Sequence, residues 1–200
     1  MAKPRRGVSD RARRYSLLVF TVGKVTEETY LVHQHRWNRL EVNVEIAKLH
    51  GTPLSLVRAA MKAKKRNEKG QKRKGPAHDE VWCVFDVDEH PNLKEAAALA
   101  REHGINVAIS NPCVELWILL HFEDQTGFID RDDAQKYAKE HTKSDGKSLS
   151  KEALEALDAR YDLARNRAKD LDAKHTGDDT RFPQNNPSSG VWRIVDAIDR

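Results

Sequence analysis

The most constraining feature of the sequence is an apolar run at residues 81–85, VWCVF, which stops at the acidic stretch DVDE of residues 86–89. An unbroken run of β-branched and aromatic residues is typical of a strand buried on both faces, as in a parallel sheet covered by helices. Carboxylates at positions i and i+2 point to the same side of an extended chain. We therefore expect Asp86 and Asp88 to converge at the carboxyl end of this strand, the edge where open α/β sheets bind ligands.

Two carboxylates this close repel each other, and a divalent cation relieves the repulsion. Asp86 and Asp88 are therefore candidate ligands of a metal ion, or part of a phosphate site. The alternative is that both aspartates cap the helix expected after Pro91, because Asp is common in such loops. An isolated DxD is a weak signal, so this stretch leaves both interpretations open.

Strands and helices alternate through residue 122, which predicts a doubly wound, mostly parallel α/β sheet flanked by helices, with a helical C-terminal extension. Besides residues 81–85, strands are expected at residues 15–21, 41–48 and 105–110, and helices at residues 26–40, from 53 onward, at 92–103 and at 111–122. The extension should hold helices at residues 132–141, 149–175 and 191–198, with a polar loop at 176–190 that can close over a site. This divides the chain into a basic tail (1–14), an α/β core (15–125) and the extension (126–200), which packs on the core.

Composition narrows the class of protein. The chain has 200 residues, of which 33% are charged, and no apolar stretch approaches the roughly 20 residues of a membrane span. The N-terminus lacks the apolar core of a signal peptide, so we expect a cytoplasmic protein without a membrane partner. Cys83 and Cys113 lie in apolar runs and are interpreted as buried thiols in a reducing compartment, which argues against a structural zinc site.

Positive charge is unevenly placed, although the formal net charge is only +4. Residues 62–76, here called the basic segment, include candidate contacts to a nucleic-acid backbone, namely Lys64, Lys65, Arg66, Lys72, Arg73 and Lys74. The alternatives are a solvated helix end with a loop, or a surface for an acidic partner. Gly23 and Lys24 occupy the turn between the first strand and its helix, where the backbone can approach a phosphate closely.

Four stretches in order resemble the RloB family of Toprim-fold proteins: GKVTEETYL (23–31), VWCVFDVDEH (81–90), ISNPCVELWILLHFED (109–124) and FPQNNPSSGVWRIVD (182–196). The resemblance covers residues 15–198 and implies a small Rossmann-like domain. The shared site of such domains combines a glutamate after the first strand with a DxD, and it binds Mg²⁺ or Mn²⁺.

The resemblance also implies a function. It indicates a metal-dependent nuclease of RNA or DNA that acts with an AAA-type or ABC-like ATPase in bacterial anti-phage defence, including abortive infection. Asp86 and Asp88 would then bind the metal. Supporting roles would fall to residues that match the family motifs: Gly23, Asn111, Glu115, Asn186 and Ser188. Glu115 is also open to another interpretation, as a carboxylate that pairs with the dipole of its own helix.

One position departs from the family pattern EGxxTE, because Val22 stands where the glutamate is expected. Valine can neither move a proton nor bind metal, so the chain is an altered protein, a naturally inactive member, or an enzyme rescued by Glu27 or Glu28. Those two glutamates lie a turn further on, and we expect poor reach; Glu27 is kept as the substitute catalytic candidate. Inactivity would leave a Toprim module that binds an ATPase or nucleic acid.

A phosphatase of the haloacid-dehalogenase type also places a DxD after a buried strand. Such an enzyme would use Asp86 as nucleophile and Asp88 as acid, usually with a small residue next. Glu89 and His90 do not fit that pattern, and the four family stretches have no place in it.

Overall fold

The computed structural model describes residues 14–23, 25–37, 42–68, 78–87, 90, 92–144 and 148–199. Predictions for Lys24, Lys72, Arg73, Lys74, Asp88 and most of the N-terminal tail fall outside these residues and stay predictions. The first part of the chain forms β1 (Ser16–Thr21), α1 (Thr26–Trp37), β2 (Asn43–Ile46), α2 (Pro53–Glu68), β3 (Glu80–Asp86), α3 (Leu93–Glu102), β4 (Asn106–Asn111) and α4 (Val114–Leu120). These elements confirm the predicted alternation of strands and helices.

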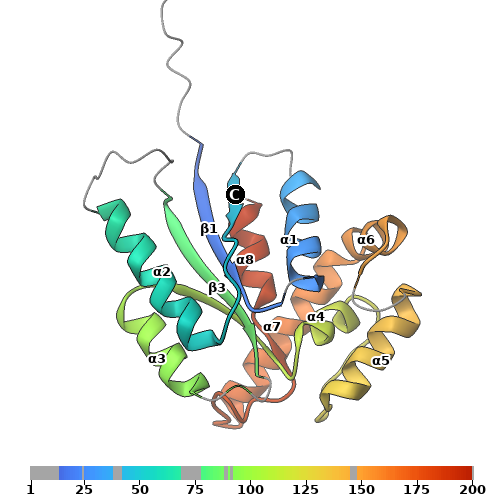
Figure 1. The fold of residues 1–200 in the computed structure, drawn as a ribbon. Coiled ribbons are helices and arrows are strands. Elements are labelled where there is room, and N and C mark those ends of the chain that lie inside the picture. The colour runs from blue at the N-terminus through green and yellow to red at the C-terminus, as the bar shows by residue number, and fades with distance from the viewer. Residues whose placement is uncertain are drawn as a thin grey trace, which may run out of the picture.

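The strands form one five-stranded sheet in the order β2-β1-β3-β4-β5 (Figure 1). The first four are parallel, and β5 (Ser188–Ser189) pairs antiparallel with β4. The predicted α/β fold with a mostly parallel, Rossmann-like sheet is therefore confirmed. Strand order reverses between β1 and β3, since the chain leaves β1 toward one edge and β3 toward the other. In such sheets the crevice at this reversal is the usual ligand site.

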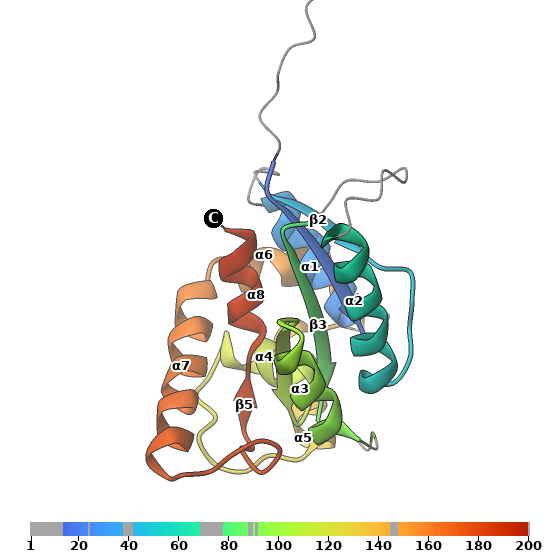
Figure 2. The ribbon, with the colours of Figure 1, turned by 90° about the vertical axis from the view of Figure 1, so that its left-hand side faces the viewer.

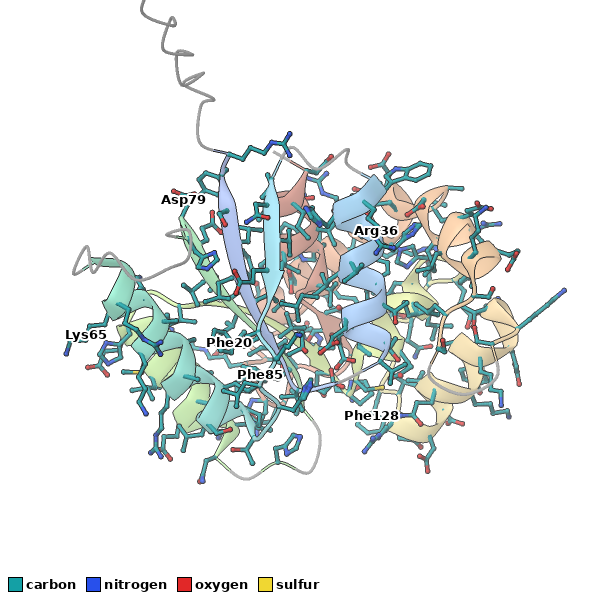
Figure 3. All side chains as sticks on the ribbon, turned by 45° about the horizontal axis from the view of Figure 1, so that its top comes forward. Phe20, Arg36, Lys65, Asp79, Phe85 and Phe128 are labelled. Atoms are coloured by element: carbon teal, nitrogen blue, oxygen red, sulfur yellow. The ribbon has the colours of Figure 1, made fainter. Side chains whose placement is uncertain are left out.

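β3 is buried on both faces, as its apolar run predicts. Trp82 and Val84 belong to a core on one face, which also includes side chains of α1, α4, α7 and α8. Val81, Cys83 and Phe85 belong to a second core, beneath α2 and α3 on the opposite face. Figure 3 shows Phe20 and Phe85 in this second core. Because its side chains alternate between the two faces, β3 contributes to the cores beneath both helical layers.

The C-terminal part shares its core with the sheet. It comprises α5 (Arg131–Thr142), α6 (Lys151–Asp158), α7 (Tyr161–Gly177), β5 and α8 (Val191–Ile198). The core that contains Trp82 also includes residues of α5, α6, α7 and α8, and Figure 2 shows β5 leading into α8 beside α7. Residues after 126 therefore complete the α1 side of the sheet.

The single long helix expected at residues 149–175 is wrong, because the chain breaks it at residues 159–160. Arg160 leaves helical geometry with φ −120° and ψ 9°, and its guanidinium donates to the Ala156 carbonyl oxygen and lies over the Phe122 ring. No Gly or Pro marks the break, so it arises from packing of the two helices against the core.

Two further expectations can be checked in the described part of the chain. Cys83 and Cys113 are both buried and unpaired with each other, as predicted. Burial raises the pKa of Cys83 to about 12, which leaves it an unreactive thiol. None of the helices that the structure describes is long and apolar enough to cross a membrane.

Candidate active site at the ends of β1 and β3

The candidate site lies where β1 and β3 end side by side. The Val22 amide donates to the Val84 carbonyl oxygen, and the Val87 amide donates to the Ser110 carbonyl oxygen. The residues that follow β1 and β3 therefore stay hydrogen-bonded to the neighbouring strand. Asp86 is the last residue of β3. Since side chains alternate along a strand, Asp86 follows Trp82 and Val84 toward the α1 and α4 side.

The helix after β3 begins several residues beyond Asp86. The N-cap of α3 is Asn92, which makes no side-chain capping hydrogen bond. Asp86 is therefore not the N-cap residue of α3, while Asp88 lies among the undescribed residues. Asp86 lines a cavity of about 330 Å³ at the switch point.

Three acidic side chains from different elements line this cavity, here called the acidic cavity. Asp86 comes from the end of β3, Glu27 from the first turn of α1, and Glu115 from the first turn of α4. Arg131, at the start of α5, and His90 also line it. The sequence pattern did not indicate Arg131, because it lies far along the chain in a polar stretch and joins the site only through packing of α5 against α4.

Glu27 reaches the strand end by folding back over Gly23. Glu27 is only 6% exposed, and a Cβ added at position 23 would overlap the Glu27 carboxylate. The expected poor reach is therefore wrong for Glu27. Glu28 points elsewhere: its carboxylate accepts a 3.4 Å hydrogen bond from the Thr21 hydroxyl and lies 3.9 Å from His50. The absence of a side chain at Gly23 leaves the space that the Glu27 carboxylate occupies, whereas Glu28 does not enter it.

Glu115 is held close to both α1 and Asp86. The Thr26 hydroxyl donates a long 3.5 Å hydrogen bond to Glu115 Oε1. Burial, and then the negative charges of Glu115 and Asp86, raise the pKa of the Cys113 thiol, which locates both carboxylates near that buried residue. Glu115 thus lies in the first turn of α4 and in the cavity wall, so the dipole and site interpretations are compatible.

Val22 also borders the acidic cavity, but its side chain packs against the core beneath α2 and α3. It continues the alternation of Leu18 and Phe20, which belong to that same core. Position 22 and Asp86 therefore point to different faces of the sheet where their strands end.

The described half of the basic segment lies far from the acidic cavity. Lys64 Nζ donates to the carbonyl oxygens of His103 (3.0 Å) and Gly104 (2.7 Å), at the C-terminal end of α3. This end precedes β4, whereas Asp86 is the last of the seven residues of the neighbouring strand β3, so about 20 Å separate the two regions. Figure 1 shows the last turn of α2 at the opposite end of the sheet from the start of α1. Charge screening over about 8 Å leaves the two regions electrostatically independent.

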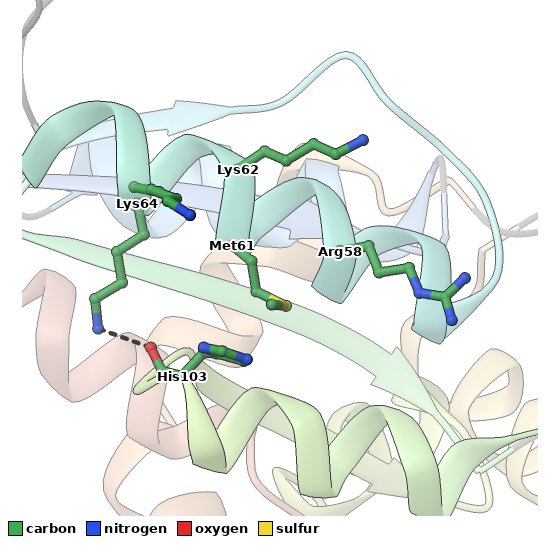
Figure 4. A pocket seen from close by; sticks show the side chains of 6 residues that line it. Arg58, Met61, Lys62, Lys64 and His103 are labelled. Atoms are coloured by element: carbon green, nitrogen blue, oxygen red, sulfur yellow. Dashed lines mark hydrogen bonds between the residues drawn. The ribbon is translucent and has the colours of Figure 1, made fainter. Parts of the chain in front are cut away.

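A groove of about 500 Å³ lies between α2 and α3, beside the described half of the basic segment (Figure 4). It is lined by Arg58, Met61, Lys62, Lys64, Lys65 and His103. Lys65 and Arg66 are exposed, and Figure 3 shows Lys65 on the outer side of α2. A nucleic acid that contacts both Lys64 and the acidic cavity must span about 20 Å, or about six base pairs of a duplex, and pass from the α2 and α3 face of the sheet to the α1 and α4 face.

Asn111, Asn186 and Ser188 form a polar network outside the acidic cavity. Asn111 Nδ2 donates to the Pro183 carbonyl oxygen, and Asn186 exchanges hydrogen bonds with the amide and carbonyl of Ile129. Ser188 accepts from Asn185 Nδ2 at 2.9 Å. These contacts fix the loop before α8 to the end of β4, so their visible role is to hold the loop.

The donor chemistry of the acidic cavity suits a hard divalent cation, because Glu27, Asp86 and Glu115 all offer carboxylate oxygens. Within the described residues, however, no three Asp, Glu, His or Cys side chains lie close enough together to hold an ion. A complete ligand set therefore needs Asp88 or a movement of the glutamates.

Comparison with known proteins gives one match. A family model described as RloB-like protein matches residues 17–198, which is nearly the whole chain. No curated protein and no solved structure matches the sequence.

Proposed function

The chain belongs to the RloB-like protein family, and we propose that it is a divalent-metal-dependent nuclease of RNA or DNA. The observation that carries the proposal is the acidic cavity, which Glu27, Asp86 and Glu115 all line at the switch point of a Rossmann-like sheet. A phosphate would not bind three carboxylates without a cation between them, because the like charges repel. Mg²⁺ or Mn²⁺ is the cofactor that makes this cavity compatible with a phosphodiester.

Each residue then has a distinct task. Asp86, with Asp88, would hold the ion, which when bound neutralises charge on the phosphate. Glu27 is buried beside the ligand site and is the group suited to hold or move a proton. Arg131 supplies a cation from α5 that can pair with a phosphate oxygen.

The biological setting follows from the family resemblance. We place the nuclease in bacterial anti-phage defence, with an AAA-type or ABC-like ATPase as its partner. The exposed lysines and arginines of the basic segment are a surface for nucleic acid on this view. Restricting cleavage to the partner-bound state would keep such a nuclease harmless in the absence of phage.

Cleavage of labelled RNA and DNA by purified protein tests the proposal, with Mg²⁺, Mn²⁺ or a chelator, and with and without the ATPase. We expect metal-dependent products that are lost in Asp86→Asn and kept in Asp170→Asn, which removes an exposed carboxylate on α7. Metal-independent cleavage, or equal cleavage by Asp86→Asn, would exclude this site.

A second candidate function is a binding module without catalysis. It is favoured by one observation, namely that Val22 stands where the family pattern has a glutamate and packs into the apolar core. This candidate predicts binding of nucleic acid or of the ATPase, with no cleavage in any metal.

A further inference from the structure

A second cavity adjoins the acidic cavity between α4 and α5. Its volume is about 320 Å³, and Thr26, Glu115 and Gln135 line both cavities. Glu115 therefore stands in a shared wall, with Asp86 on one side and the second cavity on the other. A ligand that places a phosphate near Asp86 has a neighbouring compartment for the group attached to it.

Apolar and polar side chains both line the second cavity; the polar ones are Thr26, Glu115, Gln135, Lys139, Thr142 and Ser144. Ile118, Ala138 and Leu149 are buried side chains that line it. Ser144 also lines it, and its buried hydroxyl has no hydrogen-bond partner among the described residues. A buried polar atom without a partner costs free energy unless something binds it, so this hydroxyl indicates a ligand with a polar edge.

One face of α5 runs along both cavities. Arg131 lines the acidic cavity, Gln135 lines both, and Lys139 lines the second cavity. The two cations are eight residues apart, or about 12 Å along the helix. The Gln135 amide, which offers a donor and an acceptor, lies between them. This is an order of groups that suits a base flanked by two backbone phosphates.

We propose that this cavity, here called the base pocket, binds an unpaired nucleobase next to the phosphate held at the acidic cavity. The inference rests on the proposed function and names its substrate class as single-stranded nucleic acid. A base has flat apolar faces for Ile118, Ala138 and Leu149, and a polar edge for Gln135 and Ser144. A base stacked within a duplex cannot enter a pocket of this kind without leaving the helix.

The test is a binding measurement that needs no cleavage. Short single-stranded RNA is titrated into the wild-type protein with Ca²⁺ in place of Mg²⁺, so that a cation is present at the acidic cavity, beside an abasic strand of equal length and charge. We expect the base-bearing strand to bind about fivefold more tightly, the lower end of the range for a base stacked on a side chain, because no aromatic residue among those that the structure describes lines the pocket. Equal affinity of the two strands would overturn the base pocket. A nucleoside monophosphate is the third probe, and tighter binding of it than of the strand would overturn the single-stranded substrate.

Variants then locate the effect. Gln135→Ala should reduce the preference for the base-bearing strand. Lys139→Ala should weaken binding of both strands alike, whereas Lys136→Ala removes a charge from another face of α5 and should weaken neither. Ala138→Leu should fill the pocket and abolish the preference, with a thermal melt to establish folding. An unchanged preference in both Gln135→Ala and Ala138→Leu would show that bases bind elsewhere. Cleavage is scored separately: cleavage without base preference rejects the pocket alone, and base preference without cleavage rejects the nuclease alone.

Discussion

Gly23→Ala offers a test of Glu27 that leaves Glu27 in the sequence. The added Cβ would overlap the Glu27 carboxylate, which is the far end of a flexible side chain, so the carboxylate must swing away. The backbone itself permits alanine, because Gly23, unlike Gly104, does not have a positive φ. The substitution should therefore empty one corner of the acidic cavity without unfolding the chain.

Two effects on stability are expected to cancel nearly. Alanine in place of glycine stabilises a compatible site by about 0.4–1 kcal/mol through the unfolded chain. Displacing the buried Glu27 side chain loses a contact that contributes about 0.5–1.5 kcal/mol. The melting temperature should thus change by no more than about 4 °C for a chain of this length. Loss of a carboxylate beside a metal should instead lower Mn²⁺ affinity about 10–100-fold.

Calorimetric titration with Mn²⁺ measures this effect whether or not the protein cleaves. Gly127→Ala is the matched control, because a Cβ there meets nothing within 4 Å. A role of Glu27 at the metal would be refuted if Gly23→Ala bound Mn²⁺ like the wild type while Asp86→Asn did not. Glu27 would then be a structural residue of α1, and the proton-handling group would have to be sought elsewhere.

Three other predictions follow from the same structure. Val22→Glu should raise cleavage about 10²–10⁴-fold relative to Val22→Gln, at a cost of about 1–2 kcal/mol for the lost apolar contact; equal rates in a matched metal and ATPase assay would contradict it. Replacing the six candidate cations of the basic segment by glutamine should reduce the slope of log K for nucleic-acid binding against log salt concentration by up to about 5. An unaltered slope would show that these cations contact no phosphate. Burial lowers the pKa of His121 to about 4, so the unfolded chain binds a proton below its ordinary value of 6.5 while the folded chain does not. Stability should therefore fall by about 3 kcal/mol as the pH drops from 6.5 to 4, and urea titrations of His121→Gln should show a weaker fall.

The sequence predicts those features that depend on near neighbours. The run at residues 81–85 predicts a strand buried on both faces, and its acidic end predicts the edge that carries Asp86. Thr52 before Pro53 is a typical helix start, and the Thr52 hydroxyl accepts a 3.4 Å hydrogen bond from the Ser55 amide. A glycine is typical just after a helix, and Gly104 after α3 adopts φ +59°. In each case the physical cause lies within a few residues.

Features that depend on packing between distant segments escape the sequence. Lys64 was predicted as a phosphate contact, and its ammonium is engaged by carbonyl oxygens at residues 103 and 104, which no local pattern reveals. The break between α6 and α7 has no Gly or Pro to mark it. Arg131 and the base pocket exist because α5 packs on α4, a contact between parts of the chain whose separate patterns show only helices.

The acidic cavity also explains why Val22 and Glu27 are not simple substitutes for each other. The side chain at position 22 starts from the face covered by α2 and α3, whereas Glu27 enters from α1 on the opposite face, above Gly23. A glutamate at position 22 would have to leave the apolar core and curl around the end of β1 to meet Asp86. Glu27 reaches the cavity from a helix turn that is already fixed by packing, because Gly23 has no side chain that would block the Glu27 carboxylate. The chain therefore keeps an acidic side chain at the switch point although position 22, where the family pattern EGxxTE has its first glutamate, is apolar.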